Sequence, residues 1–568
     1  MAASLDALLA DLESVKNHFG EPATGRIKRL LLRISRHEFD DARLLIRYHE
    51  ALLFLRAFPL AAGLIAPVEK QLNTFHARIE RLHALGANMS AFDDFDTSGI
   101  AGTTMQDSLN FEAARWLIHC IPRAVEIAWD EYDDERAMGA VWPHFIPLLR
   151  EDADVEANIP WRHWFGTARG RMRDAEWLIR RFERIQQKNR AESRTVGDLY
   201  DSMRLPLRWH LKNLKLSRTR NWTRPRKFFF HTQQMITRRE VSLAEELSRP
   251  APQLERLSRS DGDAVIEKIR EVMLVRYREL YGTTLGDASS VRRADLGRGV
   301  VMHLWNLPPE RRLPLRAYVA GFTLKNGVPI NYIEAIGLCE WIEVGFNTFY
   351  TYRQGETAWI YAQALRCLCA LTGAKTISVY PYQIGQNNDE ALDSGAFWFY
   401  RKLGFRSGDR DLEKLARGEE EKIARSPRYR TPRRILKRLA EAHVFYELDG
   451  AQGGPWDKFS TRNLGLLANR RMAREFSGEM DRIRETSVKE TARALRLNHE
   501  RWTDLERQSL GNWSLVLALI PGLERWAPED KRAMSSIIRA QAGANEMHYL
   551  HLTQRHARLR AELLKLGC

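Results

Sequence analysis

The residues best suited to chemistry lie well past the middle of the chain, where Tyr400 precedes Lys402, Gly404 and Phe405. After a helix, a glycine adopts the left-handed position and the next apolar residue packs back on the last turn. Leu-Gly-Phe at this point therefore predicts a helix end, with Tyr400 one turn before it. A phenol is protonated at neutral pH, so a tyrosine held there can act as a general acid. A core tyrosine is the alternative.

A second candidate lies at a predicted strand-to-helix junction, and it consists of Arg353, Gln354, Gly355, Glu356, Thr357 and Ala358. The first amides of a helix lack backbone partners and lie at the positive end of the helix dipole, so they bind phosphate groups. The glycine allows close approach of the backbone, and Arg353 can add a charge-assisted hydrogen bond. The junction therefore predicts a pyrophosphate site, with an ordinary helix start as the alternative.

Both segments resemble the GNAT acyltransferase superfamily, over roughly residues 295–410. Residues 396–405, AFWFYRKLGF, are similar to its late helix with the pattern Y-x-K-x-G-F, and residues 353–358 resemble its acyl-CoA pyrophosphate loop, (Q/R)-x-x-G-x-(G/A). The resemblance implies that Tyr400 protonates the departing CoA thiolate and that the amine attacks the thioester directly, so that no covalent acyl-enzyme cysteine is required. Two positions differ from the usual pattern, because Glu356 replaces the central glycine and Asp393 replaces an asparagine.

Carboxylates on the strand before this loop are candidates for the general base. Glu343 is the first choice, and Glu340 and Glu334 are the alternatives. A carboxylate on a mostly apolar strand can have a raised pKa and accept a proton from an ammonium group. For each of the three residues, the alternative is an outward-facing charge at the edge of the sheet that has no catalytic role. The polar loop at residues 386–390 is expected at the mouth of the same cleft, where loops often set substrate selectivity, and an ordinary solvated loop is the alternative.

The stretch Arg204–Arg239 is strongly basic and contains no Asp or Glu. Trp209, Trp222 and three consecutive phenylalanines, residues 228–230, are interspersed among its Arg and Lys side chains. Cations with stacking aromatics suit an RNA backbone, and they also suit an acidic carrier protein. The candidate partners at this stretch are therefore tRNA or an acidic carrier protein. Arg-rich helices with core aromatics and internally paired charges are the structural alternative.

These motifs favour an acyltransferase that moves an acyl group from acyl-CoA, as co-substrate, to an amine acceptor. Two alternatives remain open: a GNAT-fold transferase that uses aminoacyl-tRNA, and a non-catalytic binding or scaffold protein with a relic GNAT domain. The sequence has no Gly-x-x-x-x-Gly-Lys, Gly-x-Ser-x-Gly or His-Glu-x-x-His motif. The common NTPase, serine-hydrolase and zincin classes are thereby excluded, and no metal is expected.

The elements that must position these residues change in character along the chain. Apolar residues at helical spacing predict an all-α region over residues 1–290. Short apolar runs around Asn326-Gly327 predict a hairpin, and a helix between strands at 341–352 and 376–382 predicts a parallel crossover. A GNAT-like mixed α/β domain is thus expected over 291–424, followed by a basic linker and a helical region over 425–568. The predicted class is α+β multidomain.

Composition sets the remaining expectations. The 568 residues include 88 Lys+Arg and 73 Asp+Glu, so the formal net charge is +15. That length suggests three or four domains. No apolar stretch reaches the roughly 18 residues that a membrane span needs. Five cysteines, odd in number and without a Cys-x-x-Cys pair, fit a reducing compartment. A basic cytoplasmic protein without a membrane partner is expected.

Overall fold

The chain divides into two compact units. Unit 1 comprises Met1–Gln234 and Glu267–Thr284, and unit 2 comprises Met235–Ile266 and Leu285–Cys568. Both units combine helices with strands, so the α+β class predicted from the sequence is confirmed. The computed structural model describes residues 4–141, 161–188, 193–212, 215–278, 281–426, 428–448 and 454–568.

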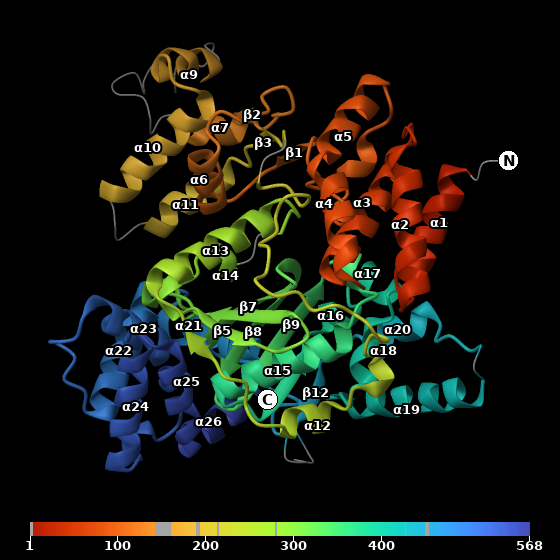
Figure 1. Ribbon diagram of the computed structural model, residues 1–568. Coiled ribbons are helices and arrows are strands. Elements are labelled where there is room, and N and C mark those ends of the chain that lie inside the picture. Colours follow the sequence, from red (N-terminus) through yellow and green to blue (C-terminus); the bar gives the residue numbers. More distant parts are fainter. Residues whose placement is uncertain are drawn as a thin grey trace. The chain divides into compact units, whose positions relative to one another are not determined.

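Unit 1 begins with five helices whose apolar faces are buried (red and orange in Figure 1). Side-chain caps define the starts of the first and the third of them: Ser4 accepts a hydrogen bond from the backbone N–H of Ala7 at 3.3 Å, and Asp41 accepts one from Leu44 at 3.1 Å. Leucines at helical spacing then fill the space between them, as predicted. The helices are α1 (Leu5–Val15), α2 (Glu21–Ser35), α3 (Ala42–Ala57), α4 (Ile65–Asn73) and α5 (Phe75–Ala84).

The rest of unit 1 corrects the prediction of an all-α region, because it contains a three-stranded antiparallel sheet of order β1-β3-β2. Its strands have only three or four residues, too few for an alternating pattern to stand out. Trp209 on the central strand is fully buried. The elements are β1 (Thr104–Asp107), α6 (Phe111–Cys120), β2 (Val125–Ile127), α7 (Glu135–Val141), α9 (Trp161–Arg169), α10 (Asp174–Lys188), α11 (Ser193–Ser202), β3 (Leu207–His210) and α14 (Tyr281–Thr284).

Unit 2 is built on a nine-stranded sheet of order β11-β12-β10-β9-β8-β7-β6-β5-β4. Neighbouring strands are antiparallel except β9 and β10, which form the parallel pair in the described part of the sheet. The strands are β4 (Glu255–Arg256), β5 (Arg292–Asp295), β6 (Val300–Trp305), β7 (Ala317–Lys325), β8 (Val328–Leu338), β9 (Trp341–Thr348), β10 (Thr376–Val379), β11 (Arg406–Ser407) and β12 (Val444–Glu447).

The predicted hairpin and crossover are both present. β7 and β8 meet at Asn326 and Gly327, whose φ angles of 48° and 76° define the left-handed turn that matches strand twist. Helix α15 (Thr357–Thr372) connects β9 to β10, as a parallel pair requires. The strand expected at 376–382 is shorter, because Pro381 starts the short helix α16 (Pro381–Ile384). This shortening leaves the carboxyl end of β10 open beside β9.

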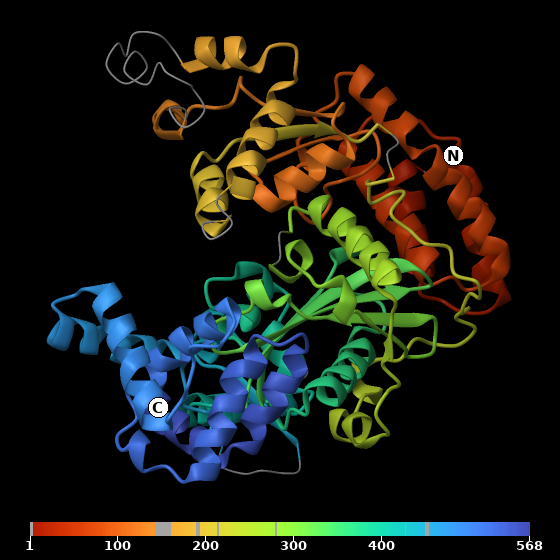
Figure 2. The same cartoon turned by 90° about the vertical axis from the view of Figure 1, so that its left-hand side faces the viewer.

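Helices cover one face of this sheet and then form a separate C-terminal group. α15 packs on β9 through Phe346 and Tyr361, whose ring centroids are 4.8 Å apart. Figures 1 and 2 show the C-terminal helices gathered together in blue. The helices are α12 (Leu243–Ser248), α17 (Asp389–Asp393), α18 (Ala396–Arg401), α19 (Arg410–Arg425), α20 (Arg433–Leu439), α21 (Thr461–Phe476), α22 (Met480–Leu495), α23 (Asp504–Leu517), α24 (Pro528–Gln541), α25 (Glu546–Arg555) and α26 (Ala557–Gly567). Helix α13 (Arg259–Leu274) begins in unit 2, and its residues from Glu267 onward belong to unit 1.

The segment after residue 424 differs from the predicted linker. It carries helix α20 and then strand β12, which lies between β10 and β11. Val444 of β12 pairs with Val379 of β10, and Phe445 pairs with Ser378. The sheet therefore takes a strand from the region that the sequence assigned to C-terminal helices. A four-residue strand after an Arg-rich helix gives too short a pattern to be recognised.

Replacing Gly327 by alanine should lower the free energy of unfolding by about 1 kcal/mol, because an L side chain is strained at positive φ. Gly418, in the middle of α19 with no atom within 4 Å of an added Cβ, is the matched control. Gly418→Ala should raise the stability by about 1 kcal/mol. Thermal unfolding of the two variants checks the pair, and equal melting temperatures would contradict the assigned turn.

Candidate functional site

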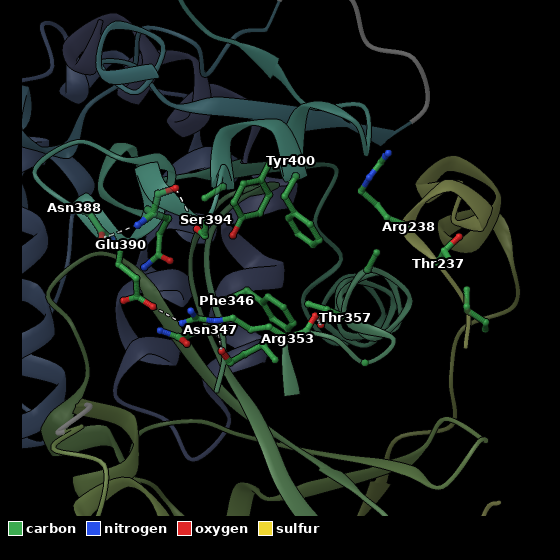
Figure 3. Close-up of a pocket in the computed structure, with 18 residues that line it drawn as sticks. Thr237, Arg238, Phe346, Asn347, Arg353, Thr357, Asn388, Glu390, Ser394 and Tyr400 are labelled. Atoms are coloured by element: carbon green, nitrogen blue, oxygen red, sulfur yellow. Dashed lines mark hydrogen bonds and ion pairs between the residues drawn. The ribbon is translucent and has the colours of Figure 1, made fainter. Parts of the chain in front are cut away.

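A cavity of about 420 Å³ in unit 2 lies where β9 ends and α15 begins. Phe346, Asn347 and Thr348 of β9 form one wall (Figure 3). The turn before α17 and the helix α18 form another wall, and residues 236–238 supply a third. The parallel pair opens at this point because β10 ends at Val379. The cavity is within the size range of small-molecule sites, about 300–1,000 Å³.

The first turn of α15 faces this cavity. Gly355, Thr357 and Ala358 line it, as the sequence predicts for a phosphate-binding turn. The N-cap of α15 makes no side-chain hydrogen bond to the first turn, so no side chain of its own satisfies those amides. With sixteen residues, α15 is long enough for its dipole to add to the attraction for an anion.

Glu356 belongs to the predicted loop but does not line the cavity. Its side chain is fully buried and forms ion pairs with Arg298 and with Lys325, the latter at 3.2 Å. It also accepts a hydrogen bond from the backbone N–H of Ile236 at 3.2 Å. Burial lowers the pKa of Lys325 to about 8, while the charge of Glu356 acts in the opposite direction. The carboxylate is thus neutralised by two cations.

Arg353 lines the cavity, whereas Gln354 is exposed and does not. The Arg353 guanidinium pairs with Glu390 on α17, and its Nε donates to the Thr348 carbonyl at 3.3 Å. About a third of each charged side chain is exposed, 33% and 38%. An ion pair this open to solvent contributes little to stability and exchanges readily for another anion. Arg353 is therefore available to a phosphate that enters the cavity.

Tyr400 lies on α18 one turn before Gly404, as the spacing predicts, and its side chain lines the cavity. Its ring packs edge-on against Tyr361 and Phe405, at centroid distances of 5.6 and 5.7 Å. Figure 3 shows the hydroxyl pointing into the cavity, and no described residue hydrogen-bonds to it. Burial raises the pKa of this phenol above its ordinary value, so it remains protonated at neutral pH. Gly404 has a φ of 101°, which confirms the predicted helix end.

Glu343, the first candidate base, does not line the cavity. Its carboxylate contacts Arg316 at 3.5 Å and His443 Nε2 at 3.0 Å. Burial raises its pKa, but the hydrogen bond from His443 and the charge of Arg316 outweigh burial, so the net pKa is lowered. Glu340, the second candidate, is held by Arg560 instead. Neither carboxylate has the environment of an efficient base.

Glu334 does not line the cavity either, but its environment differs from that of the other two carboxylates. Burial raises its pKa to about 7, and the Tyr318 hydroxyl donates a hydrogen bond to it. Glu334 lies directly opposite Gly345 on the neighbouring strand β9. A Cβ atom added at Gly345 would lie 3.5 Å from the side-chain amide of Gln383, and Gln383 lines the cavity. Glu334 is therefore on the sheet face that carries Gln383. The sequence named it only as an alternative, because burial cannot be read from residue type.

The cavity also contains residues that the motifs did not indicate. Ile236, Thr237 and Arg238 come from a segment more than one hundred residues before β9. Asn388 and Glu390 come from the polar loop that was expected at the mouth of the cleft. The only signal for Arg238 was its place at the end of the acid-free basic stretch.

The basic stretch Arg204–Arg239 is divided, with residues 204–234 in unit 1 and 235–239 in unit 2. Within unit 1, several of its cations are paired internally. Arg208 contacts Asp130 at 2.9 Å, and the nearly buried Arg218 binds Glu50 through both oxygens at 2.6 and 2.7 Å. These contacts favour the structural alternative for that part of the stretch. Residues 213 and 214 lie outside the described residues.

Comparisons with known proteins add no identification: no protein-family model, curated protein or solved structure matches this chain. Within the described ranges, no group of three His, Cys, Asp or Glu side chains is placed to hold a metal ion. None of the described helices combines the length and the apolar character that crossing a bilayer requires. The function must therefore be argued from the cavity.

The buried ion pairs of Glu356 generate a stability prediction. Glu356→Gln leaves the Lys325 ammonium buried without its counter-charge, which should lower the free energy of unfolding by about 3–5 kcal/mol. Adding Lys325→Met should restore part of this loss. Arg417, whose side chain is 72% exposed where it pairs with Glu413, is the control, and Arg417→Gln should cost under about 1 kcal/mol. Urea unfolding measures these variants and Lys325→Met alone, and losses that simply add in the double variant would exclude the pairing.

Proposed function

We propose that unit 2 is an acyltransferase that moves an acyl group from acyl-CoA to an amine. One observation carries the proposal: a single cavity contains the open first turn of α15, the Arg353 guanidinium and the Tyr400 hydroxyl. The resemblance of the two segments to the GNAT superfamily assigns these groups to the pyrophosphate and the leaving thiolate. The β9–α15–β10 crossover supports the same assignment, because it puts both motifs at one end of a parallel pair.

The donor would bind with its pyrophosphate at the α15 turn. The amides of Thr357 and Ala358 and the positive end of the helix dipole would hold the phosphate oxygens. Arg353 would exchange Glu390 for a phosphate, which offers a charge-assisted hydrogen bond of greater strength. The pantetheine arm would then extend between the diverging ends of β9 and β10 toward Tyr400.

In the transfer step, the amine nitrogen attacks the thioester carbonyl carbon. The new carbon–nitrogen bond forms as the carbon–sulfur bond breaks, and the sulfur leaves with the bonding electrons. Tyr400 gives its proton to that thiolate, and a carboxylate takes the proton that the attacking nitrogen loses. No covalent acyl-enzyme is needed. Of the three predicted carboxylates, Glu334 suits the role best, because its pKa lies near neutrality.

The two other functions considered from the sequence have weaker support. Recognition of tRNA relied on the whole basic stretch, yet Arg208 and Arg218 serve internal ion pairs. A relic domain would have no catalytic reason to keep a cavity with an open helix turn and a phenol whose hydroxyl faces it. A non-catalytic role remains the alternative that the following experiment tests.

Tyr400→Phe removes one hydroxyl and leaves the ring packing with Tyr361 and Phe405 intact. It should lower kcat about 100-fold or more while the melting temperature and the Kd for acetyl-CoA stay unchanged. Thiol release from acetyl-CoA with a panel of simple amines measures kcat, and calorimetry measures Kd. Phe399→Leu, a change beside it in the same aromatic group, is the control for packing. If Tyr400→Phe has the same kcat as the wild-type protein, Tyr400 contributes only to packing.

The pKa of Glu334 predicts the pH dependence. A base must be deprotonated, so kcat should rise with pH through a midpoint near 7 and level off above it. Glu334→Gln should remove this limb and lower kcat by about 100-fold, whereas Glu343→Gln should leave the midpoint in place. A midpoint near 7 that persists in Glu334→Gln would assign the base elsewhere.

A further inference from the structure

An open cavity of about 540 Å³ in unit 1 lies along helix α4. Lys70 of α4 and Arg224 line it together, and both side chains are exposed. Lys28 of α2 lies beside it, because its Nζ would be 2.7 Å from a Cβ atom added at Gly63, the neighbour of the lining residue Ala62. In the described part of the chain, none of these three cations forms an ion pair. We call Lys28, Lys70 and Arg224 the cavity cations.

A carboxylate, Glu69, also lines this cavity, but its charge is already neutralised. Arg56 of α3 donates to both carboxylate oxygens of Glu69, at 2.6 and 3.0 Å, and the Arg56 side chain is only 3% exposed. The remaining polar groups at the wall, Asn73 and Thr74, are neutral. The Asn73 side-chain oxygen accepts a hydrogen bond from Arg220 at 2.5 Å, which brings a further cation to the cavity. The cavity is therefore positively charged.

Arg224 belongs to a loop that tertiary contacts hold at both ends. Before it, the Thr219 carbonyl accepts a hydrogen bond from Arg56 at 2.9 Å. After it, the backbone N–H of His231 donates to the Pro59 carbonyl at 2.9 Å. The loop is thus built into the surface of unit 1 beside α3 and α4.

An aromatic row runs through the same loop. Trp222 contacts Phe228 at a ring-centroid distance of 6.2 Å, and Phe228 stacks on Phe230 at 5.9 Å. All three side chains are partly exposed. Between them in sequence lie the loop cations Arg226 and Lys227, which are exposed and form no ion pair within the described ranges. Cations interspersed with partly exposed aromatic rings can bind phosphate groups and stack nucleobases together.

We propose that this surface binds single-stranded RNA, with one nucleotide in the cavity and the flanking phosphates on the loop. The volume is within the range of small-ligand sites, about 300–1,000 Å³, so one nucleotide fits. The internal ion pairs of Arg208 and Arg218 precede this loop and leave its cations available.

Three features of the surface favour this ligand. The cavity cations and the loop cations match consecutive phosphates of a backbone. A duplex keeps its bases stacked inside and offers none to the aromatic row, so the row favours a single strand. Asn73 and Thr74 can hydrogen-bond a 2′-hydroxyl, the group that distinguishes RNA from DNA. The site lies within unit 1 and does not depend on the acyl transfer proposed for unit 2.

The test measures the fluorescence anisotropy of a labelled single-stranded RNA of about 12 nucleotides, at about 50 to about 200 mM salt. Lys70→Gln with Arg224→Gln should raise the Kd about 10-fold or more. It should also lower the slope of log Kd against log salt by about 1.4, because each lost phosphate contact removes about 0.7. Arg171→Gln with Arg184→Gln, two exposed cations before and on α10, is the control with the same loss of charge and should leave both quantities nearly unchanged. Phe228→Leu should weaken binding about 5-fold without changing the slope, since stacking carries no charge.

Unchanged melting temperatures will show that the variants keep the fold. The inference fails if the folded wild-type protein does not bind the RNA at about 50 mM salt, or if the cavity variant and the control variant bind it equally well. It also fails if a duplex RNA of the same length, or an acidic peptide with the same number of charges, binds as tightly as the single strand, because charge alone then explains the binding. Equal binding of single-stranded DNA of the same sequence would overturn the assignment to RNA.

Discussion

The buried carboxylate of Glu356 is the interaction on which the candidate site depends. A charge taken out of water is costly unless it is paired and hydrogen-bonded, and Glu356 meets both conditions through Lys325, Arg298 and the N–H of Ile236. These partners come from the end of β7, from the loop before β6 and from the segment that forms a wall of the cavity. One carboxylate therefore ties three distant segments to the start of α15.

This pairing also explains how the α15 turn tolerates an acidic residue. On sequence grounds, a carboxylate in place of the central glycine of a pyrophosphate loop opposes anion binding. In the fold, two cations neutralise Glu356, and its buried side chain does not line the cavity. Gly355, Thr357 and Ala358 of this turn still line the cavity, so the substitution changes what supports the turn and leaves these residues at the cavity wall.

Aromatic packing sets the environment of Tyr400 in a comparable way. Tyr361 on α15 contacts Phe346 on β9 and both Tyr400 and Phe405 around α18. These rings exclude water from the phenol, so its pKa rises and its proton is retained. Helix α15 thus contributes residues of its first turn to the cavity and, one turn later, contributes Tyr361 to the aromatic packing around Tyr400. The two motifs are coupled through α15.

The sequence by itself determined the local structures. Asn326-Gly327 between apolar runs predicted the hairpin, and the spacing from Tyr400 to Gly404 predicted the helix end, because turn and cap geometry depend on neighbouring residues. The change from helical spacing to short apolar runs near residue 299 predicted the central strands of the large sheet, whereas β4 and β5, which precede that point, were not predicted. Very short strands such as β3 and β12 were missed, since three or four residues do not establish a period.

Tertiary structure alone decided which residues share the site. Contacts between segments far apart in the chain bring residues 236–238 to the cavity wall and neutralise Glu356. Such contacts also determine that the pKa of Glu334 is raised while that of Glu343 is lowered. The basic stretch gives the clearest example, because Arg218 is buried in an ion pair while Arg238 lines the cavity. Residue type records that a group can carry charge, whereas burial and partners, which set its pKa and its availability, exist only in the folded chain.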